Sequence, residues 1–281
     1  MNTIIKRLAG CGATLAAVVM LTSPVLADGM RRGSVKDAPV SEERRCKLSA
    51  NVALATEYVF RGYSQTAENP AVQGGFDATC GIFYAGVWAS NLDWGGDFAG
   101  NDIANIEMDW YVGIKPVTGK ITWDLGVIYY SYPGSADFIP GRENNYFEIK
   151  VGGSAEIWKD GTFGVTVFYS PDYQYEVGNV WTVETSFAQV LPKVGMFTPT
   201  FSALLGYQQG DDVAYQAITG NGDDNYLYWN AGLTLGFHEK GSLDLRYWDT
   251  NLGSNAGGSA WCKGQIFQCD ERFVATLKFT Y

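Results

Sequence analysis

Apolar side chains alternate with polar or small ones over stretches of about ten residues, and this alternation restricts the fold more than any other feature. Between Asn225 and His238 every second residue is apolar, and the residues between them are tyrosine, asparagine, glycine or threonine. The same pattern recurs over 106–114, 121–129 and 273–281. Because successive side chains of a strand point to opposite faces, each stretch predicts a β-strand with one apolar and one polar face. Strands of this length can cross the apolar core of a bilayer.

Read along the whole chain, the pattern predicts about twelve strands joined by connections that are alternately short and long. The expected strands are 49–60, 71–80, 82–90, 103–115, 119–131, 144–155, 162–170, 179–190, 198–208, 225–238, 241–250 and 271–281. The expected long loops are 61–70, 91–102, 132–143, 171–178, 209–224 and 251–270. Aromatic residues near the loop ends of strands predict an interfacial girdle of Phe60, Tyr129, Tyr169, Trp181, Tyr207 and Tyr247.

These features predict an all-β fold, a transmembrane antiparallel up-and-down β-barrel with short periplasmic turns and long extracellular loops. An even number of strands places both ends of the barrel on the periplasmic side. A soluble β-sandwich also alternates and is the alternative fold, but its strands are typically only five or six residues long. No stretch after the amino terminus has 18 consecutive apolar residues, which excludes a transmembrane helix.

The amino terminus has the order of a secretory signal peptide. Lys6 and Arg7 precede an apolar run, and Ala27 is a small residue at a suitable cleavage position. We therefore expect three parts: a signal peptide at 1–27, a polar periplasmic segment at 28–47 and an outer-membrane barrel at 48–281. Lipidation at Cys11 is the alternative, but a lipobox should follow the apolar run rather than precede most of it.

Charge excludes one class of partner. Removing residues 1–27 takes away two of the 20 basic residues and none of the 30 acidic ones, so the net charge moves from −10 to −12. Nucleic-acid binding needs a basic surface, and none is expected here. The expected partners are outer-membrane lipid, small solutes and, through the last strand, the barrel-assembly machinery. The sequence assigns no oligomeric state.

Two stretches carry a family resemblance. The ending 273–281 alternates and closes on Tyr281, and it resembles the carboxy-terminal assembly signal of bacterial outer-membrane proteins. The opening Ser49-Ala50-Asn51-Val52-Ala53-Leu54-Ala55-Thr56-Glu57-Tyr58-Val59-Phe60-Arg61-Gly62-Tyr63-Ser64-Gln65, with Tyr169-Ser170-Pro171-Asp172-Tyr173, resembles the proteobacterial TorF-type family of porins. The resemblance would cover the whole mature chain, and it implies an outer-membrane channel without assigning functional residues.

The alternation also predicts which charged residues face the lumen. The candidate pore-lining residues are Glu57, Asp77, Glu107, Asp109, Asp124, Glu148, Lys150, Glu184, Asp244, Arg246, Arg272 and Lys278. Acids outnumber bases among them, so the lumen is expected to be acidic and to favour cations or neutral polyhydroxylated solutes. Glu107, Asp109 and Asp124 are expected to lie close together, with Lys150 as their partner. The alternative is that these charges only cross-link the barrel wall.

Four cysteines remain after cleavage, an even number in an oxidising compartment. Cys262 and Cys269 share the longest expected loop, and Cys46 and Cys80 lie at the same end of neighbouring strands, so these are the two expected disulfides. A metal site is the alternative, but the chain has a single histidine and no clustered cysteine spacing, so neither a metal nor another cofactor is expected.

The basic residues of 28–47 allow one further hypothesis, in which this segment folds into an acidic lumen and plugs it; a disordered tail is the alternative. Catalysis is not expected, because His238 lies at a periplasmic turn, away from any nucleophile. The first hypothesis for function is therefore a porin for passive diffusion of small hydrophilic solutes. The second is a non-transporting surface protein whose loops bind a partner.

Overall fold

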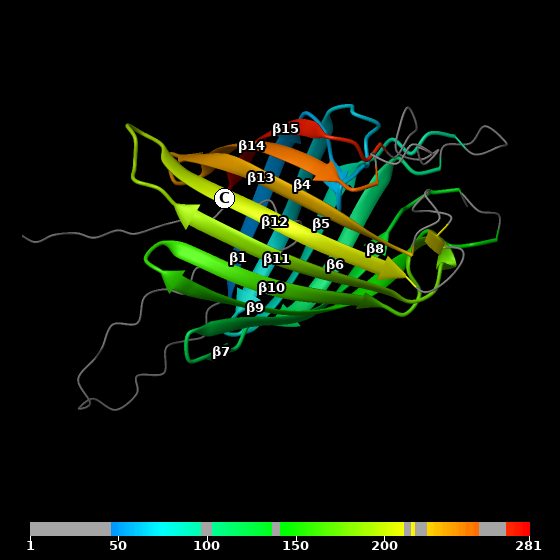
Figure 1. Ribbon diagram of the computed structural model, residues 1–281, viewed down its shortest axis with the longest axis horizontal. Helices are drawn as coiled ribbons and strands as arrows, with labels where there is room; N and C mark the ends of the chain where they lie inside the picture. Colours follow the sequence, from blue (N-terminus) through cyan, green and yellow to red (C-terminus); the bar gives the residue numbers. More distant parts are fainter. Residues whose placement is uncertain (1–45, 97–102, 137–140, 211–214, 217–223, 253–267) are drawn as a thin grey trace, which may run out of the picture.

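Twelve long strands form one closed antiparallel sheet (Figure 1). The structure is a computed structural model and describes residues 46–96, 103–136, 141–210, 215–216, 224–252 and 268–281. The long strands are β1 (Lys47–Ala55), β4 (Ala71–Cys80), β5 (Phe83–Asn91), β6 (Ile106–Ile114), β8 (Ile121–Ser131), β9 (Tyr146–Trp158), β10 (Gly161–Ser170), β11 (Val180–Val190), β12 (Thr198–Gly210), β13 (Asn225–Phe237), β14 (Gly241–Thr250) and β15 (Arg272–Thr280).

Each strand pairs with its neighbours in the chain, and the first pairs with the last. Strand β1 pairs with β4 on one side and with β15 on the other, which closes the ring. The short strand β7 (Val117–Thr118) adds two pairs to β8 beyond the end of β6. A closed ring leaves no unpaired sheet edge, as a bilayer requires. The predicted antiparallel barrel is confirmed, and the β-sandwich alternative is wrong.

The two ends of the barrel differ in the length of their connections. At the turn end lie the tight connections, such as 81–82 and 159–160, together with the start of β1 and the end of β15. At the loop end, on the right in Figure 1, the strands are joined by the long connections. Within the described residues no helix is long and apolar enough to span a bilayer.

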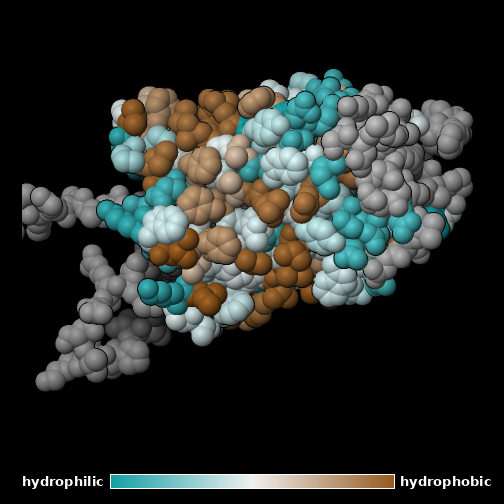
Figure 2. Space-filling view, in the orientation of Figure 1, coloured by the Kyte–Doolittle hydropathy of each residue, from teal (hydrophilic) through white to brown (hydrophobic). Residues whose placement is uncertain are grey.

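The outer face of the barrel is apolar. Leu54, Phe76 and Phe273 point outward and are 57%, 69% and 80% exposed, whereas charged residues such as Glu148 and Arg246 are buried inside. Figure 2 shows hydrophobic side chains spread over the strand surface and hydrophilic ones at both ends of it. Of the predicted girdle, Tyr129, Trp181 and Tyr207 are exposed on this surface. The polarity is therefore the reverse of a soluble protein's.

The first predicted strand, 49–60, is wrong at its far end. Strand β1 stops at Ala55, and residues 58–66 fold into the lumen instead of forming the first part of an external loop. We call residues 58–66 the strap. Its short strands β2 (Val59–Phe60) and β3 (Tyr63–Ser64) flank Arg61 and Gly62, whose φ angles of 50° and 89° are those of a type I′ hairpin turn. Phe60 consequently packs inside the barrel against Tyr130 and not in the girdle.

Candidate functional site: the barrel lumen

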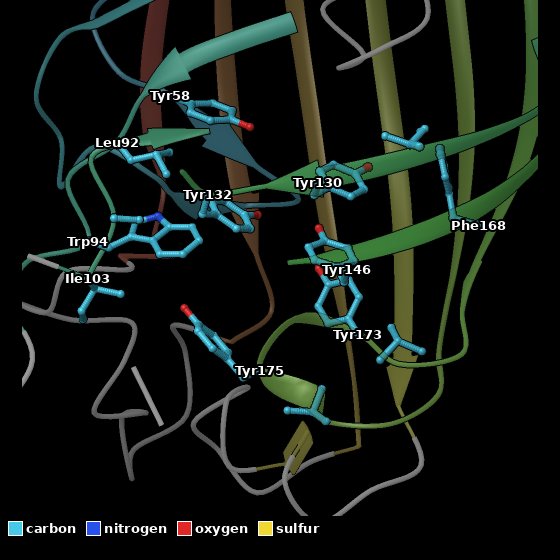
Figure 3. Packing of buried hydrophobic residues seen from close by; sticks show 14 of the residues in the cluster. Tyr58, Leu92, Trp94, Ile103, Tyr130, Tyr132, Tyr146, Phe168, Tyr173 and Tyr175 are labelled. Carbon is cyan, nitrogen blue, oxygen red and sulfur yellow. The ribbon is translucent and has the colours of Figure 1, made fainter. Parts of the chain in front are cut away.

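The loop-end half of the lumen is filled by aromatic side chains. Tyr130 and Tyr146 stack with ring centroids 4.4 Å apart, and Tyr173 lies 4.6 Å from Tyr146 on its other side (Figure 3). Trp94 packs on Tyr132 at 4.6 Å, and Trp94 and Tyr132 belong with Tyr130 and Tyr146 to one buried cluster. The described parts of the long loops therefore turn inward and pack as a core.

One of these loops also contributes Tyr175, which has φ 63° in the 3-10 turn η1 (Gln174–Glu176). Its ring lies 6.3 Å from that of Trp94, and burial raises the pKa of its hydroxyl well above the usual range. The Tyr175 hydroxyl is therefore neutral, and its ring acts as a packing group.

The strap runs through this core and is bound to the barrel wall by charged groups. The two terminal guanidinium nitrogens of Arg61, Nη1 and Nη2, donate to the two carboxylate oxygens of Glu148 at 2.7 and 2.8 Å. Both side chains are almost fully buried, 3% and 1% exposed. The Tyr58 hydroxyl contacts both carboxylate oxygens of Glu107 at 3.1 Å. These contacts tie the strap to β9 and to β6.

Aromatic rings cover the guanidinium group of Arg61, whose Nε atom is buried without a hydrogen-bond partner in the described part of the chain. Its guanidinium carbon lies 4.8 Å from the centroid of the Phe60 ring and 5.0 Å from that of Phe168. Tyr130 donates a third hydrogen bond to Glu148 at 2.9 Å. A guanidinium stays charged in any protein environment, so this is a buried ion pair held by a bidentate bond.

Three of the buried acids in the lumen form no ion pair within the described residues: Glu107, Asp109 and Glu184. Glu107 and Asp109 are two residues apart on one face of β6, and Asp109 is 0% exposed with no hydrogen bond to either carboxylate oxygen. Glu184 accepts a hydrogen bond from Tyr228 at 2.7 Å. Among the described residues, no lysine or arginine forms an ion pair with any of these three.

The turn-end half of the lumen carries polar side chains that lie against its wall. Asp124 accepts hydrogen bonds from Tyr84 at 2.7 Å and from Lys150 at 2.9 Å, and the Lys115 amine is 3.7 Å away. A Cβ atom on Gly113 would lie only 2.4 Å from the Tyr84 hydroxyl oxygen and would clash with it. Glycine at 113 therefore lets the tyrosine lie flat on the sheet.

A second network braces strands β12, β13 and β14. Arg246 donates to Asp244 at 2.9 and 3.0 Å, to Asn230 at 2.6 Å and to Ser202 at 2.8 Å. Nearby, Arg272 donates to Glu57 at 2.6 Å and to Asp270 at 2.7 Å. These are wall-to-wall contacts within or beside the sheet, and they leave few free charges there.

The twelve predicted lumen residues all lie on the inner side of the barrel, buried or half-buried. The structure brings together Asp124 with Lys150, Asp244 with Arg246, and Glu57 with Arg272. The expected group of Glu107, Asp109 and Asp124 is wrong. Asp109 lies opposite Tyr130 in the sheet, six residues along β8 from Asp124, about 20 Å at strand spacing. Within the described residues, the ion pair of Lys150 is with Asp124.

Sequence reasoning missed Tyr58, Arg61, Tyr84 and Lys115. Tyr84 has the same parity as lumen-facing Gly86, so its position was available from the alternation. Arg61-Gly62 between two short β-prone pairs is a hairpin signal, but only the folded barrel places that hairpin against Glu148.

The cysteines follow the expected pairing where they are described. Cys46 and Cys80 form a disulfide with Cα atoms 4.4 Å apart, and it joins the base of β1 to the end of β4. Cys269 is also disulfide-bonded, while Cys262 lies outside the described residues. The signal peptide, Cys11 and residues 28–45 lie outside them as well. No group of three or more metal-ligating side chains occurs in the part of the chain that the structure describes.

Comparison with known proteins supports the fold. A KdgM porin is similar to this chain with a TM-score of 0.51 and 9% identity, over 83% of this chain and 99% of the porin. A structure of KdgM porin in complex with disordered oligogalacturonate gives a TM-score of 0.52 and 7% identity, over 83% and 98%. At these identities the likeness concerns the fold alone.

The search of curated proteins finds no match. A family model does match, over residues 41–281, and it describes a bacterial protein of unknown function, Gcw_chp. The chain belongs to the Gcw_chp family.

Proposed function

We propose that this protein is an outer-membrane porin that admits small hydrophilic solutes through a narrow lumen. The observation that carries the proposal is the polarity of the closed barrel, with an apolar outer surface and charged residues inside. A non-transporting scaffold has no need of buried charge along the whole wall, because buried ion pairs are weak stabilisers. The fold likeness to KdgM porin and the resemblance to TorF-type porins support the same class.

The proposed channel prefers cations. Arg61 and Lys115 add two bases to the predicted lumen, yet Glu107, Asp109 and Glu184 have no basic partner among the described residues. Carboxylates that line a water-filled pore in their ionised form attract cations and repel anions. Asp77 likewise has no ion pair among the described residues and accepts a hydrogen bond from Tyr111, whereas Glu57, Asp124, Glu148 and Asp244 are paired.

The proposal includes the route to the membrane. Residues 1–27 act as a signal peptide cleaved after Ala27, residues 28–47 remain in the periplasm, and the last strand is read by the barrel-assembly machinery. Strand β1 already begins at Lys47, so the barrel includes the end of that segment. The turn end then faces the periplasm and the loop end faces outward. Mass spectrometry of the protein from outer membranes should give a chain that starts at Asp28.

The experiment for transport is single-channel recording of purified protein in planar bilayers. We expect current whose reversal potential in a KCl gradient indicates cation preference. The triple variant Glu107→Gln, Asp109→Asn, Glu184→Gln should shift that potential toward zero selectivity. The double variant Asp244→Asn, Arg246→Gln, which removes both members of an ion pair and leaves the net lumen charge unchanged, is the matched control and should leave the reversal potential in place. An anion-selective wild type would refute the acidic lumen and leave a channel standing.

A second function is favoured by the packed aromatic core at the loop end. If the lumen never opens, the protein is a surface scaffold whose loops bind a partner. Absence of current in wild type and in variants with a loosened loop-end half would favour this second function.

A further inference from the structure

The strap crosses the lumen and touches opposite walls of the barrel. On one side it binds β6 through Tyr58 and β9 through Arg61. On the other, the Arg61 carbonyl accepts a hydrogen bond from Tyr226 of β13 at 3.1 Å, and Val59 packs with Trp248 of β14 and Val274 of β15. The barrel's interior at this level is therefore divided by a piece of its own chain.

Strap side chains leave no free space along this crossing. Tyr58, Arg61 and Ser64 are buried, and Ser64 and Thr66 are 0% exposed. A Cβ on Gly62 would lie 2.2 Å from a methyl carbon of Thr250, so even the turn of the strap touches the wall. A hydrated solute cannot pass such a contact, and the strap is a barrier in this conformation.

The strap is nevertheless separable from the barrel. Strands β2 and β3 pair only with each other, in a two-stranded sheet distinct from the barrel sheet. Both ends of the strap return to the loop end, through Ala55 on one side and exposed residues 68–70 on the other. Withdrawing it would break no strand pairing of the barrel and, of the backbone contacts near β15, only the hydrogen bond from the Ser64 amide to the Gln268 carbonyl.

The strongest contact between strap and wall is the ion pair of Arg61 with Glu148. It is the one ion pair joining the strap to a barrel strand within the described part of the chain. Its two parallel hydrogen bonds need both nitrogens of a guanidinium, which lysine cannot supply.

We propose that the strap is a gate that closes the loop-end half of the lumen, and that the Arg61–Glu148 pair is its latch. The gate rests on the proposed channel function. When the latch is broken, the strap leaves toward the loop end and the lumen conducts solutes along the polar wall below it. Arg61 is thus a positioning residue that acts through the strap.

The test combines a variant that lacks the ion pair with an engineered disulfide, the lock, that holds the strap to the wall. Arg61→Ala should raise mean single-channel current several-fold over wild type, and Arg61→Lys should give a smaller rise. The lock adds Gly62→Cys and Thr250→Cys, because the Cβ at 62 would lie 3.7 Å from that of Thr250, within disulfide range. In the triple variant, oxidation should abolish the gain in current and reductant should restore it.

Two controls separate the gate from general loosening. Cys46→Ser combined with Cys80→Ser removes a disulfide at the turn end that involves neither the strap nor a lumen ion pair, and it should leave the current at the wild-type value. The current of the wild-type protein is also measured with and without reductant, which shows how far reduction of the native Cys46–Cys80 disulfide alone changes it.

A labelling experiment covers the case in which the locked protein does not fold, since Gly62 has a positive φ. Ser64→Cys should react slowly with a soluble maleimide when Arg61 is present and many-fold faster with Arg61→Ala. Equal rates would overturn the gate.

The outcomes distinguish this proposal from the channel itself. If the oxidised and the reduced triple variant carry the same measurable current, the strap is not a gate, but the protein is still a channel. Absence of current in every variant, including one with residues 58–66 replaced by a Gly-Ser linker, means that the channel proposal fails and the gate fails with it.

Discussion

The loop-end and turn-end halves of the lumen are built on the same twelve strands but filled in different ways. In the loop-end half, aromatic residues from loops and strands pack on one another, and one buried ion pair fixes the strap among them. In the turn-end half, Tyr84 and Lys150 lie along the wall around Asp124, which keeps some contact with solvent. The first half resembles a protein core and the second a lined passage.

This difference indicates that the loop-end half of the lumen controls the passage of solutes. A barrel wall of fixed strand number sets a lumen width, but side chains and inserted segments decide whether the space is open. Here the inserted segment comes from the first loop, and it is anchored by groups that the wall supplies. Changes to the loop-end half should therefore alter both stability and the opening of the lumen, whereas changes to the turn-end half should not open it.

The largest effect is expected from Tyr146→Ala, which removes the middle ring of the stack between Tyr130 and Tyr173. We expect a loss of about 3–5 kcal/mol in the free energy of unfolding, measured by urea titration in detergent micelles. Tyr84→Ala in the turn-end half, where the ring lies flat against the sheet outside the aromatic cluster, is the control and should cost clearly less. Equal losses would mean that the two halves are packed alike.

Arg61→Ala should be nearly as costly, because it leaves Glu148 buried without its cation. Breaking such a pair costs about 3–5 kcal/mol, seen here as a lower midpoint of thermal unfolding by circular dichroism. Lys150→Ala leaves Asp124 with the hydroxyl of Tyr84 and the nearby Lys115 amine, so it should cost much less. A larger drop in the unfolding midpoint for Lys150→Ala than for Arg61→Ala would contradict this difference between the two halves of the lumen.

Cys46→Ser should weaken the turn end without affecting passage. The disulfide closes a loop with a sequence separation of 34 residues, and its loss should cost about 2–4 kcal/mol. The same urea titration measures the cost, and Cys80→Ser should match it because each variant breaks the same bond. A change in open-channel current would show that the turn end takes part in gating.

The smallest effect is expected from Tyr84→Phe. It removes one hydrogen bond to Asp124 while Lys150 still holds that carboxylate, so the loss should be about 1 kcal/mol. Urea titration beside Tyr58→Phe, which removes the contact to Glu107 in the loop-end half, sharpens the comparison. Tyr58→Phe should also raise the current, and Tyr84→Phe should not.

The barrel itself was predictable from the sequence because its cause is local. Lipid-facing and lumen-facing positions alternate in every strand, and tight and long connections alternate around the ring. Even the inner position of Glu148 or Asp244 follows from parity once the strand is recognised. The same parity placed Cys46 and Cys80 at one end of neighbouring strands, where they are bonded.

The partners across the lumen depend on stagger and on insertion, which the pattern does not encode. Asp109 and Asp124 are on the same face of neighbouring strands, yet the register sets Asp109 opposite Tyr130 and separates the two acids. Arg61 reads as an external loop residue because it follows an apparent strand of ordinary length. Only the closed ring brings Glu148, 87 positions later, within reach of it.

The sequence alone thus determined a β-barrel with its wall, its two kinds of ends and its inward charges, since these depend on the two-residue period and on chain order. The tertiary structure alone decided which charges pair and that the first loop occupies the lumen. Those outcomes depend on the free energy of filling a closed space, where a buried arginine is tolerated only opposite a carboxylate that a distant strand provides.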